Sequence, residues 1–178
     1  MNRIGWRIIP ILFFLLLSVL LWRGLSLDPH TLPSVQVGKI LPAFALPELI
    51  HPEKIFKSNQ IPQQVVLLNV WASWCAACVD EQVFMMELSR KGVPVYGLNY
   101  KDNADDAIKW LEQWGNPYKV IVQDSQGKTA IDLGVYGAPE TFIIDKKGLI
   151  RYRHAGIMSQ KVWADEMAPL MKQLDNNG

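Results

Sequence analysis

The stretch from Val65 to Gln82, VVLLNVWASWCAACVDEQ, constrains the fold more than any other part of the chain. Residues 65–70 form a short, near-continuous apolar run, which is typical of a strand covered on both faces. From residue 78 to residue 88, apolar residues recur at helical spacing, with acidic and amide side chains between them. Cys75 and Cys78, the only two cysteines, fall where the strand gives way to the helix. A buried strand that runs directly into a helix predicts parallel pairing with the strand that follows.

The rest of the chain continues this alternation up to a final helix. We expect further strands at residues 93–100, 118–122, 140–145 and 149–156, and further helices at residues 104–114, 128–133 and 162–174. Lys146-Lys147-Gly148 predicts a hairpin between the last two strands, and Pro169 predicts a kink or break in the last helix. Residues 39–63 are rich in proline and predict only a short hairpin or arm. This order predicts an α/β sandwich whose mixed sheet is flanked by helices.

The first segment predicts a transmembrane anchor. Residues 8–22, IIPILFFLLLSVLLW, run for 15 residues without a charged side chain. As a helix they span about 22 Å, so the apolar residues just before them are needed to approach the roughly 30 Å of a bilayer core. A tryptophan stands near each end, as interfacial aromatic residues do. A cleavable signal peptide is the alternative, because Gly24-Leu25-Ser26 offers small residues at alternate positions.

Charge gives this segment a direction. Arg3, Arg7 and the N-terminal amine outweigh Arg23, which predicts a cytoplasmic N-terminus and an exported body. These three arginines belong to the 18 basic residues of a chain with 17 acidic ones, so the remainder is mildly acidic and unsuited to nucleic acid. We therefore expect an uncleaved anchor at residues 1–27, a tether at 28–38 and one folded domain at 39–178.

The position of the cysteines predicts redox chemistry. Backbone N–H groups and the positive end of a helix dipole favour an anion at a helix N-terminus, and a thiolate is such an anion. A Cys-X-X-Cys pair in this position has a lowered pKa at its first thiol. Cys75 is therefore expected to be the nucleophile, and Cys78, one helical turn further on, the resolving thiol. We expect Trp74 to shield one face of the pair and to leave Cys75 near the surface.

Two structural interpretations compete with this one. A purely structural disulfide would close a very small loop at a helix-initiating site, which stabilises a protein little. A zinc site needs four ligands, and the chain has no second cysteine pair. His30, His51 and His154 lie far from the cysteines in the sequence and show no ligand spacing.

Two further features are expected at the same site. Pro139 begins a strand, and a proline beside such a cysteine pair is often cis, which would present the backbone of Ala138 to a bound chain. The alternative is an ordinary trans turn proline. Glu81 lies three residues beyond Cys78 on an adjoining face of the helix, where a partly buried carboxyl would share a proton with the thiol. A solvated helix glutamate is the alternative.

Four stretches, LLNVWASWCAAC, GLNYKD, LGVYGAPETFIID and RYRHAG, together resemble the DsbE/CcmG type of thioredoxin-like protein. These are membrane-anchored thiol:disulfide interchange proteins of bacterial cytochrome c maturation, and the likeness covers nearly the whole chain. It implies a thioredoxin-like fold and a periplasmic reductase on the inner membrane, kept reduced by a membrane electron donor. Its client would be the heme-binding cysteines of apocytochrome c, reduced directly or through a partner thiol protein.

The resemblance also implies roles for residues. It implies a redox pair that needs no metal or organic cofactor, a cis-proline at a docking groove, and acidic groups near the site. The catalytic residues are then Cys75, Cys78 and Glu81, and the residues that meet the substrate are Trp74, Ala138, Pro139 and Glu140.

The chain departs from general thioredoxin in two places. Asn69 stands where thioredoxin has a buried aspartate. An asparagine cannot take the proton that Cys78 must release, so Glu81 becomes the candidate base. Ala76-Ala77 replaces a dipeptide in which relatives commonly have a proline, and this leaves the reduction potential open.

Two other functions stay open. One is a general periplasmic disulfide reductase. The other is a thioredoxin-like copper-delivery protein, in which His154 would join the two cysteines as a ligand. Such carriers have a Cys-X-X-X-Cys pair, whose spacing is one residue longer than in this chain, so the redox function is favoured.

Overall fold

The protein is represented by a computed structural model that describes residues 3–25 and 36–176. The chain divides into two compact units, Met1–Pro33 and Ser34–Gly178. Most of the expected tether at 28–38 lies outside the described residues, as does Ser26 of the alternative cleavage site.

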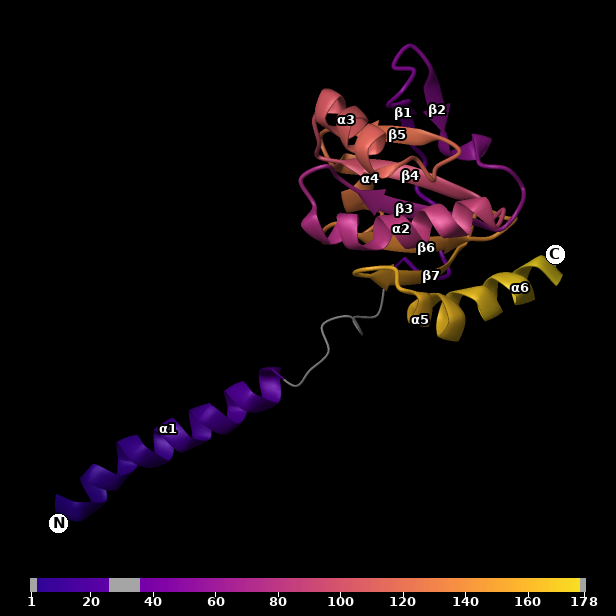
Figure 1. Cartoon of the computed structure of the whole chain (residues 1–178). Helices are drawn as coiled ribbons and strands as arrows, with labels where there is room; N and C mark the ends of the chain where they lie inside the picture. The colour runs from indigo at the N-terminus through magenta and orange to yellow at the C-terminus, as the bar shows by residue number, and fades with distance from the viewer. Residues whose placement is uncertain (1–2, 26–35, 177–178) are drawn as a thin grey trace. The chain divides into compact units, whose positions relative to one another are not determined.

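In the first unit, helix α1 (Arg3–Leu25) extends over 23 residues (Figure 1). The side chains from residue 9 to residue 24 are exposed. The Ser18 hydroxyl donates to the Phe14 carbonyl at 2.8 Å, which keeps this polar group paired within the helix. In the part of the chain that the structure describes, no helix combines the length and hydrophobicity that a membrane crossing requires. The anchor at residues 1–27 stays a prediction.

The second unit is built on a five-stranded sheet in the order β5–β4–β3–β6–β7 (Figure 1). The strands β3 (Val66–Trp71), β4 (Val95–Tyr100) and β5 (Ile121–Asp124) run parallel to one another. The strands β6 (Glu140–Ile144) and β7 (Ile150–Ala155) are antiparallel to their neighbours and form the expected hairpin. The mixed sheet is therefore confirmed, with β3 at its centre and buried along its whole length.

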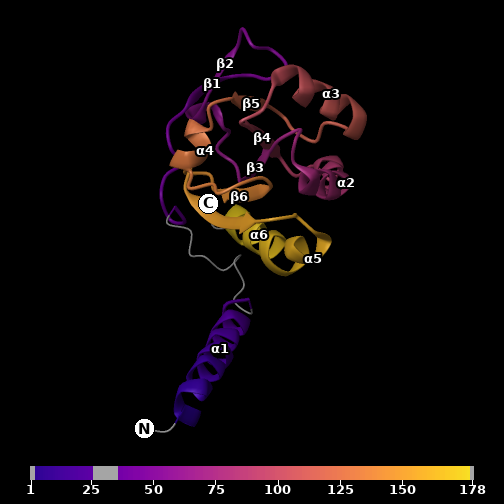
Figure 2. The same ribbon diagram turned by 90° about the vertical axis from the view of Figure 1, so that its left-hand side faces the viewer.

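Helices cover both faces of this sheet. The helices α2 (Ala76–Arg90) and α3 (Ala104–Trp114) lie on one face, and α4 (Lys128–Asp132) lies on the other (Figure 2). The C-terminal helix α6 (Ala168–Asn176) shares the face of α2 and α3, since all three contribute to one buried apolar cluster. Coverage on both faces explains why β3 is apolar, apart from Asn69, rather than alternating.

The proline-rich segment before the sheet forms the short hairpin that its sequence predicts. Strand β1 (Ala45–Pro47) pairs antiparallel with β2 (Ile55–Lys57), and a single 3-10 turn, η2 (Ser58–Gln60), follows. Next to the hairpin, the Leu49 N–H donates to the Ile121 carbonyl at 2.8 Å. The segment therefore covers part of the edge that β5 would otherwise expose.

The start of β5 differs from the prediction. The strand begins at Ile121 rather than at residue 118. Asn116 Oδ1 accepts the Tyr118 N–H at 3.0 Å, which holds the chain in a local turn before the strand. Tyr118 therefore lies in the loop before β5, and its side chain is buried in the cluster that contains the cysteines.

The last helix continues through Pro169, so of the expected kink or break the break is wrong. Helix α5 (Gln160–Val162) passes through a π turn, η3 (Trp163–Met167), directly into α6. The Ala168 N–H donates to the Trp163 carbonyl, five residues back. The helix therefore widens just before the proline, which has no N–H to donate, and then continues.

Candidate active site

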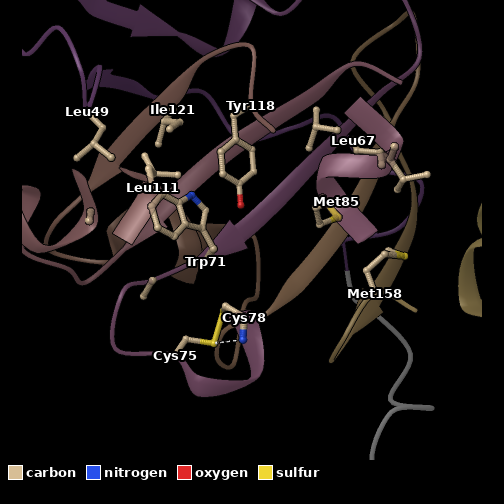
Figure 3. Close-up of a cluster of buried hydrophobic side chains, with 14 of the residues drawn as sticks. Leu49, Leu67, Trp71, Cys75, Cys78, Met85, Leu111, Tyr118, Ile121 and Met158 are labelled. Atoms are coloured by element: carbon tan, nitrogen blue, oxygen red, sulfur yellow. Dashed lines mark hydrogen bonds between the residues drawn. A yellow bond between two sulfur atoms is a disulfide. The ribbon is translucent and has the colours of Figure 1, made fainter. Parts of the chain in front are cut away.

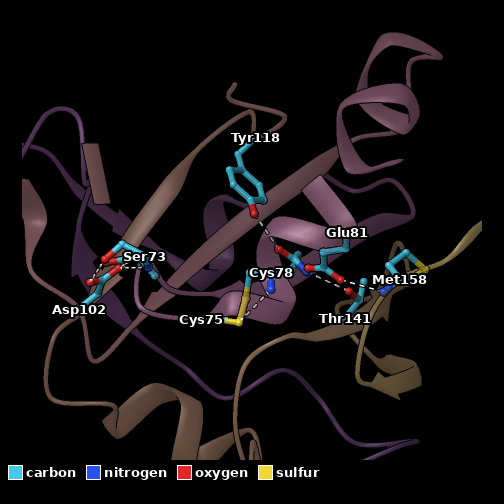
Figure 4. The surroundings of a disulfide bond; sticks show 10 residues. Ser73, Cys75, Cys78, Glu81, Asp102, Tyr118, Thr141 and Met158 are labelled. Atoms are coloured by element: carbon cyan, nitrogen blue, oxygen red, sulfur yellow. Dashed lines mark hydrogen bonds between the residues drawn. A yellow bond between two sulfur atoms is a disulfide. The ribbon is translucent and has the colours of Figure 1, made fainter. Parts of the chain in front are cut away.

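The two cysteines lie where the sequence predicts, between the end of β3 and the start of α2. Cys75 is the N-cap residue of α2, and its Sγ accepts the Cys78 N–H at 3.1 Å (Figure 4). The pair is disulfide-bonded, with Cα atoms 5.3 Å apart. A sulfur that already accepts an amide hydrogen at a helix N-terminus is well placed to carry negative charge when reduced.

Both sulfurs are less accessible than expected. Cys75 is 4 % exposed and Cys78 is 1 % exposed, so the expectation that Cys75 lies near the surface was wrong. Both residues pack into the buried cluster that also holds Trp71, and Figure 3 shows the disulfide at one end of it. Cys75 is nevertheless the more accessible of the two, which fits its role as the first thiol to meet a partner.

Trp74 directly precedes Cys75 and lies on a braced loop. Its side chain is 56 % exposed, and its Nε1 donates to the Lys101 carbonyl at 3.0 Å. Just before it, the Ser73 N–H and Oγ each donate to the Asp102 carboxylate at 2.6 Å. The Asn99 amide donates to the same carboxylate at 2.8 Å. The GLNYKD stretch, which the sequence identifies only by resemblance, therefore ties the cysteine loop to the end of β4.

The predicted proline turn faces the same cluster. The Ala138–Pro139 peptide bond is cis, as expected. Ala138 is half-buried and packs against the cluster that contains both cysteines. Before it, an added side chain at Gly137 would meet only open space, and Tyr136 is 72 % exposed. The turn thus presents accessible backbone and one exposed aromatic ring.

Glu140 lies beneath this turn rather than at its open side. Its carboxylate pairs with the Arg153 guanidinium through two hydrogen bonds of 2.7 and 2.9 Å, and it accepts the Tyr136 N–H at 2.9 Å. The Arg153 guanidinium also lies over the Tyr136 ring, 4.7 Å from its centre. The carboxylate is 3 % exposed. Glu140 therefore supports the turn from inside, and any effect it has on a substrate passes through the turn.

Glu81 is buried on the inner side of α2, one helical turn beyond Cys78. It is 2 % exposed, so the alternative of a solvated helix glutamate is wrong. Its Oε1 accepts from the Asn69 amide at 2.9 Å, and its Oε2 accepts the Met158 N–H at 2.8 Å (Figure 4). Burial raises the pKa of this carboxyl to about 7, against the opposing effect of the two hydrogen bonds. An acid of this strength changes its protonation near neutral pH.

Asn69 has a larger part than its sequence position indicates. The residue is fully buried, and its amide nitrogen donates to Glu81 and, at 3.0 Å, to the Thr141 hydroxyl. Its carbonyl oxygen accepts from the Tyr118 hydroxyl at 2.7 Å. Sequence reasoning treated Asn69 only as a lost proton acceptor. The available signal was that a buried asparagine on a central strand must find hydrogen-bond partners for its amide.

Within the described residues, no three histidine, cysteine or acidic side chains converge in a way that would hold a metal ion. The His154 ring lies on β7, and its Nε2 is 3.2 Å from the Ile157 carbonyl. In the sheet register His154 lies opposite Thr141, and among the described residues its ring forms no converging ligand set with the two cysteines, so the copper-delivery alternative gains no support from the geometry.

Comparison with known proteins agrees with this geometry. A family model described as Redoxin matches residues 36–169. The thiol:disulfide interchange protein DsbE of Pseudomonas aeruginosa is 45 % identical over 167 residues, covering 94 % of this chain and 93 % of that protein. The DsbE of Tatumella citrea is 49 % identical over 168 residues and covers 91 % of each chain.

Solved structures place the fold as well. A thiol:disulfide interchange protein DsbE from Chlorobium tepidum is 30 % identical with a TM-score of 0.61, covering 82 % of this chain and 100 % of that one. A secreted thiol-disulfide isomerase from Corynebacterium glutamicum is 26 % identical with a TM-score of 0.64, covering 74 % and 85 %. The fold is thus thioredoxin-like, and the chain belongs to the Redoxin family and, within it, to the DsbE group of thiol:disulfide interchange proteins.

Proposed function

We propose that this protein is a membrane-anchored, periplasmic disulfide reductase of cytochrome c maturation. Its client is the disulfide between the heme-binding cysteines of apocytochrome c, or that of a partner thiol protein acting on them. A thiol-reducing membrane electron donor returns the pair to the dithiol form. The observation that carries the proposal is the hydrogen bond from the Cys78 N–H to Cys75 Sγ at the N-terminus of α2. The buried Glu81 lies one helical turn after Cys78.

The first step is attack by the Cys75 thiolate on one sulfur of the client disulfide. A bond forms between Cys75 and that sulfur, and the second client sulfur leaves as a thiolate with the electron pair of the broken bond. The Cys78 amide and the helix dipole stabilise the attacking thiolate before this step. No metal or organic cofactor takes part in the exchange.

The second step releases the client. Cys78 gives up its thiol proton and attacks Cys75, forming the intramolecular disulfide, and the remaining client sulfur leaves as a thiolate. Two electrons have then passed from the pair to the client. Glu81 is the group proposed to take the Cys78 proton, because the pKa of its carboxyl, raised to about 7 by burial, lies near the working pH. Asn69 has no free basic group for this task.

The surface around the disulfide suits an extended client chain. Trp74, next to Cys75, offers an exposed aromatic ring, and the cis turn offers the backbone of Ala138 for strand-like pairing. Glu140, paired with Arg153, holds that turn in place.

The proposed location rests on the first segment of the chain. An uncleaved helix at residues 1–27 would cross the inner membrane once, with its N-terminus in the cytoplasm and the domain at 39–178 in the periplasm. Supporting this, the side chains of α1 from residue 9 to 24 are exposed and the Ser18 hydroxyl is paired within the helix. The tether at 28–38 would give the domain reach above the membrane.

The test is a matched pair of alanine variants of the full chain in detergent. With a disulfide-bonded peptide carrying the Cys-X-X-Cys-His heme motif, Cys78→Ala should accumulate a mixed disulfide at Cys75, because the resolving thiol is gone. Cys75→Ala should neither form the adduct nor reduce the peptide. Reduction by Cys75→Ala at the rate of the unmodified protein would contradict the mechanism. Equal rates on the heme-motif peptide and on insulin would favour a general reductase over the narrow client.

A further inference from the structure

Tyr118 is a buried titratable group that the exchange steps above do not use. Its ring stacks on Trp71 with centroids 5.6 Å apart and planes at 15°. Gly97 provides the space for this arrangement, because a side-chain carbon added there would lie 3.0 Å from both Trp71 Nε1 and Tyr118 Cγ. Figure 3 shows Tyr118 and Trp71 side by side above the disulfide, with the phenol oxygen directed toward the site.

The Tyr118 hydroxyl bonds the Asn69 amide, which in turn donates to Glu81. The hydroxyl donates to Asn69 Oδ1 at 2.7 Å. Burial, and then the nearby Glu81 carboxyl, raise the pKa of Tyr118 well above its ordinary value. The O–H group therefore keeps its proton and remains a hydrogen-bond donor at every pH in which the protein works.

This contact determines which way the Asn69 amide faces. With Oδ1 accepting from the phenol, the amide nitrogen faces Glu81 Oε1 at 2.9 Å and Thr141 Oγ1 at 3.0 Å. Every polar atom of the amide then has a partner. The reversed amide would place its oxygen against the Glu81 carboxylate, which has no hydrogen to offer when ionised.

We propose that Tyr118 is a positioning residue of the thiol exchange: it fixes the Asn69 amide in the orientation that donates to Glu81 and so sets the proton affinity of that carboxyl. Tyr118 itself touches neither the sulfurs nor the client in this account. The effect on exchange rate rests on the proposed role of Glu81, whereas the effect on the Glu81 titration does not.

Few groups compete with Tyr118 for this influence on Glu81. Its own helix brings Cys78, and β6 brings the neutral Thr141. Strand β7 brings His154, opposite Thr141, and the loop after β7 brings the Met158 amide. Among the described residues, Glu81 makes no ion pair, and the causes that shift its pKa are burial, the Met158 amide and the Asn69 amide. On the C-terminal helices, Glu166 bonds the Tyr152 hydroxyl, and Lys161 pairs with Asp165.

The test is a carboxyl NMR titration of Glu81 in the oxidised full chain, in detergent, comparing the unmodified protein with Tyr118→Phe. Phenylalanine keeps the stack on Trp71 and removes only the hydroxyl. In this variant Asn69 Oδ1 has no partner while the amide nitrogen donates to ionised Glu81. When Glu81 is protonated, the amide is free to turn, and Oδ1 then accepts from the acid. Protonation is therefore favoured, and Glu81 should become about tenfold weaker as an acid. A Glu81 titration that does not move would overturn the inference.

Tyr96→Phe is the matched control. Tyr96 is also buried, but it packs in the cluster on the opposite face of the sheet. Removing the Tyr96 hydroxyl should leave the midpoint of the Glu81 titration unchanged. An equal shift of that midpoint in both variants would contradict a specific role for Tyr118. In the unmodified protein, the Asn69 side-chain amide resonances should move with the Glu81 titration. Amide resonances that show free rotation would also overturn the inference, whatever the variant does.

Rate measurements separate this inference from the proposed function. If Tyr118→Phe moves the Glu81 titration while Glu81→Gln leaves the pH profile of exchange unchanged, the inference stands and the role of Glu81 as proton acceptor fails. If Glu81→Gln changes the pH profile and Tyr118→Phe moves neither quantity, the role of Glu81 stands and the inference fails.

Discussion

Glu81 and Glu140 are equally buried carboxyls on opposite faces of the same sheet, and they are held in different ways. Each is 2 % exposed. Glu140 faces the Arg153 guanidinium, so its charge is compensated by two short hydrogen bonds to a cation. Among the described residues, the donors to Glu81 are neutral: the Asn69 amide and the Met158 backbone. Burial depth alone therefore does not decide the role of an acid; the charge of its partners does.

The two acids therefore have different roles. The acid paired with arginine holds structure, in this case the turn before Pro139. An acid that meets only neutral donors in an apolar site changes its protonation near neutral pH, which suits proton transfer at Cys78. The sheet keeps the two apart, because Glu140 and Thr141 are successive residues of β6 and point to opposite faces.

The largest expected effect comes from removing the cation that compensates Glu140. Arg153→Met keeps most of the aliphatic volume and leaves the buried carboxylate with backbone donors but no cation, so the free energy of unfolding should fall by about 3–5 kcal/mol. Urea unfolding of the oxidised protein measures it. Adding Glu140→Gln to this variant should restore most of the loss. A loss below about 1 kcal/mol in the single variant would mean that the pair is not what holds the turn.

A somewhat smaller effect is expected from the pH dependence of stability through Glu81. Its carboxyl has a pKa of about 7 in the folded protein against 4.5 as its ordinary value, so the folded state binds the extra proton. Its contribution to stability is complete below pH 4.5 and is lost as pH rises through 7, on the order of 3 kcal/mol in total.

The measurement is the urea unfolding free energy of the unmodified protein minus that of Glu81→Gln, across this pH range. The difference should decline as pH rises, because only the unmodified protein loses a proton at this site. Identical pH dependence in the unmodified and Glu81→Gln proteins would place Glu81 with Glu140 as a purely structural acid.

Local sequence pattern predicted most of the fold. The apolar run of β3 and the helical spacing after it placed Cys75 at a strand–helix junction, and the structure makes it the N-cap of α2. The helix at 104–114 was predicted with its observed bounds. The start of β5 and the π turn before Pro169 were missed, because each depends on one specific hydrogen bond rather than on periodicity.

The site was predictable only where a motif is contiguous. The cysteine pair and the cis turn lie within short stretches of sequence. The partners of Asn69 do not, since Tyr118 and Thr141 lie 49 and 72 positions away. Spacing carries no information about such contacts, which form only once the sheet brings distant strands together. For the same reason the sequence could not show that Glu140 is neutralised by Arg153 while Glu81 is left without a cation.

The central claim is that Glu81 takes the proton that Cys78 releases when the client departs. The most direct measurement is the single-turnover rate at which a heme-motif peptide is released from its mixed disulfide with Cys75. The reaction is run at a series of pH values from 5 to 9, and each time point is stopped with acid. Relative to the unmodified protein, Glu81→Gln should slow release about tenfold near neutral pH and remove the inflection there, whereas Glu140→Gln should keep the inflection in place. Release from Glu81→Gln with the rate and pH profile of the unmodified protein would contradict the account.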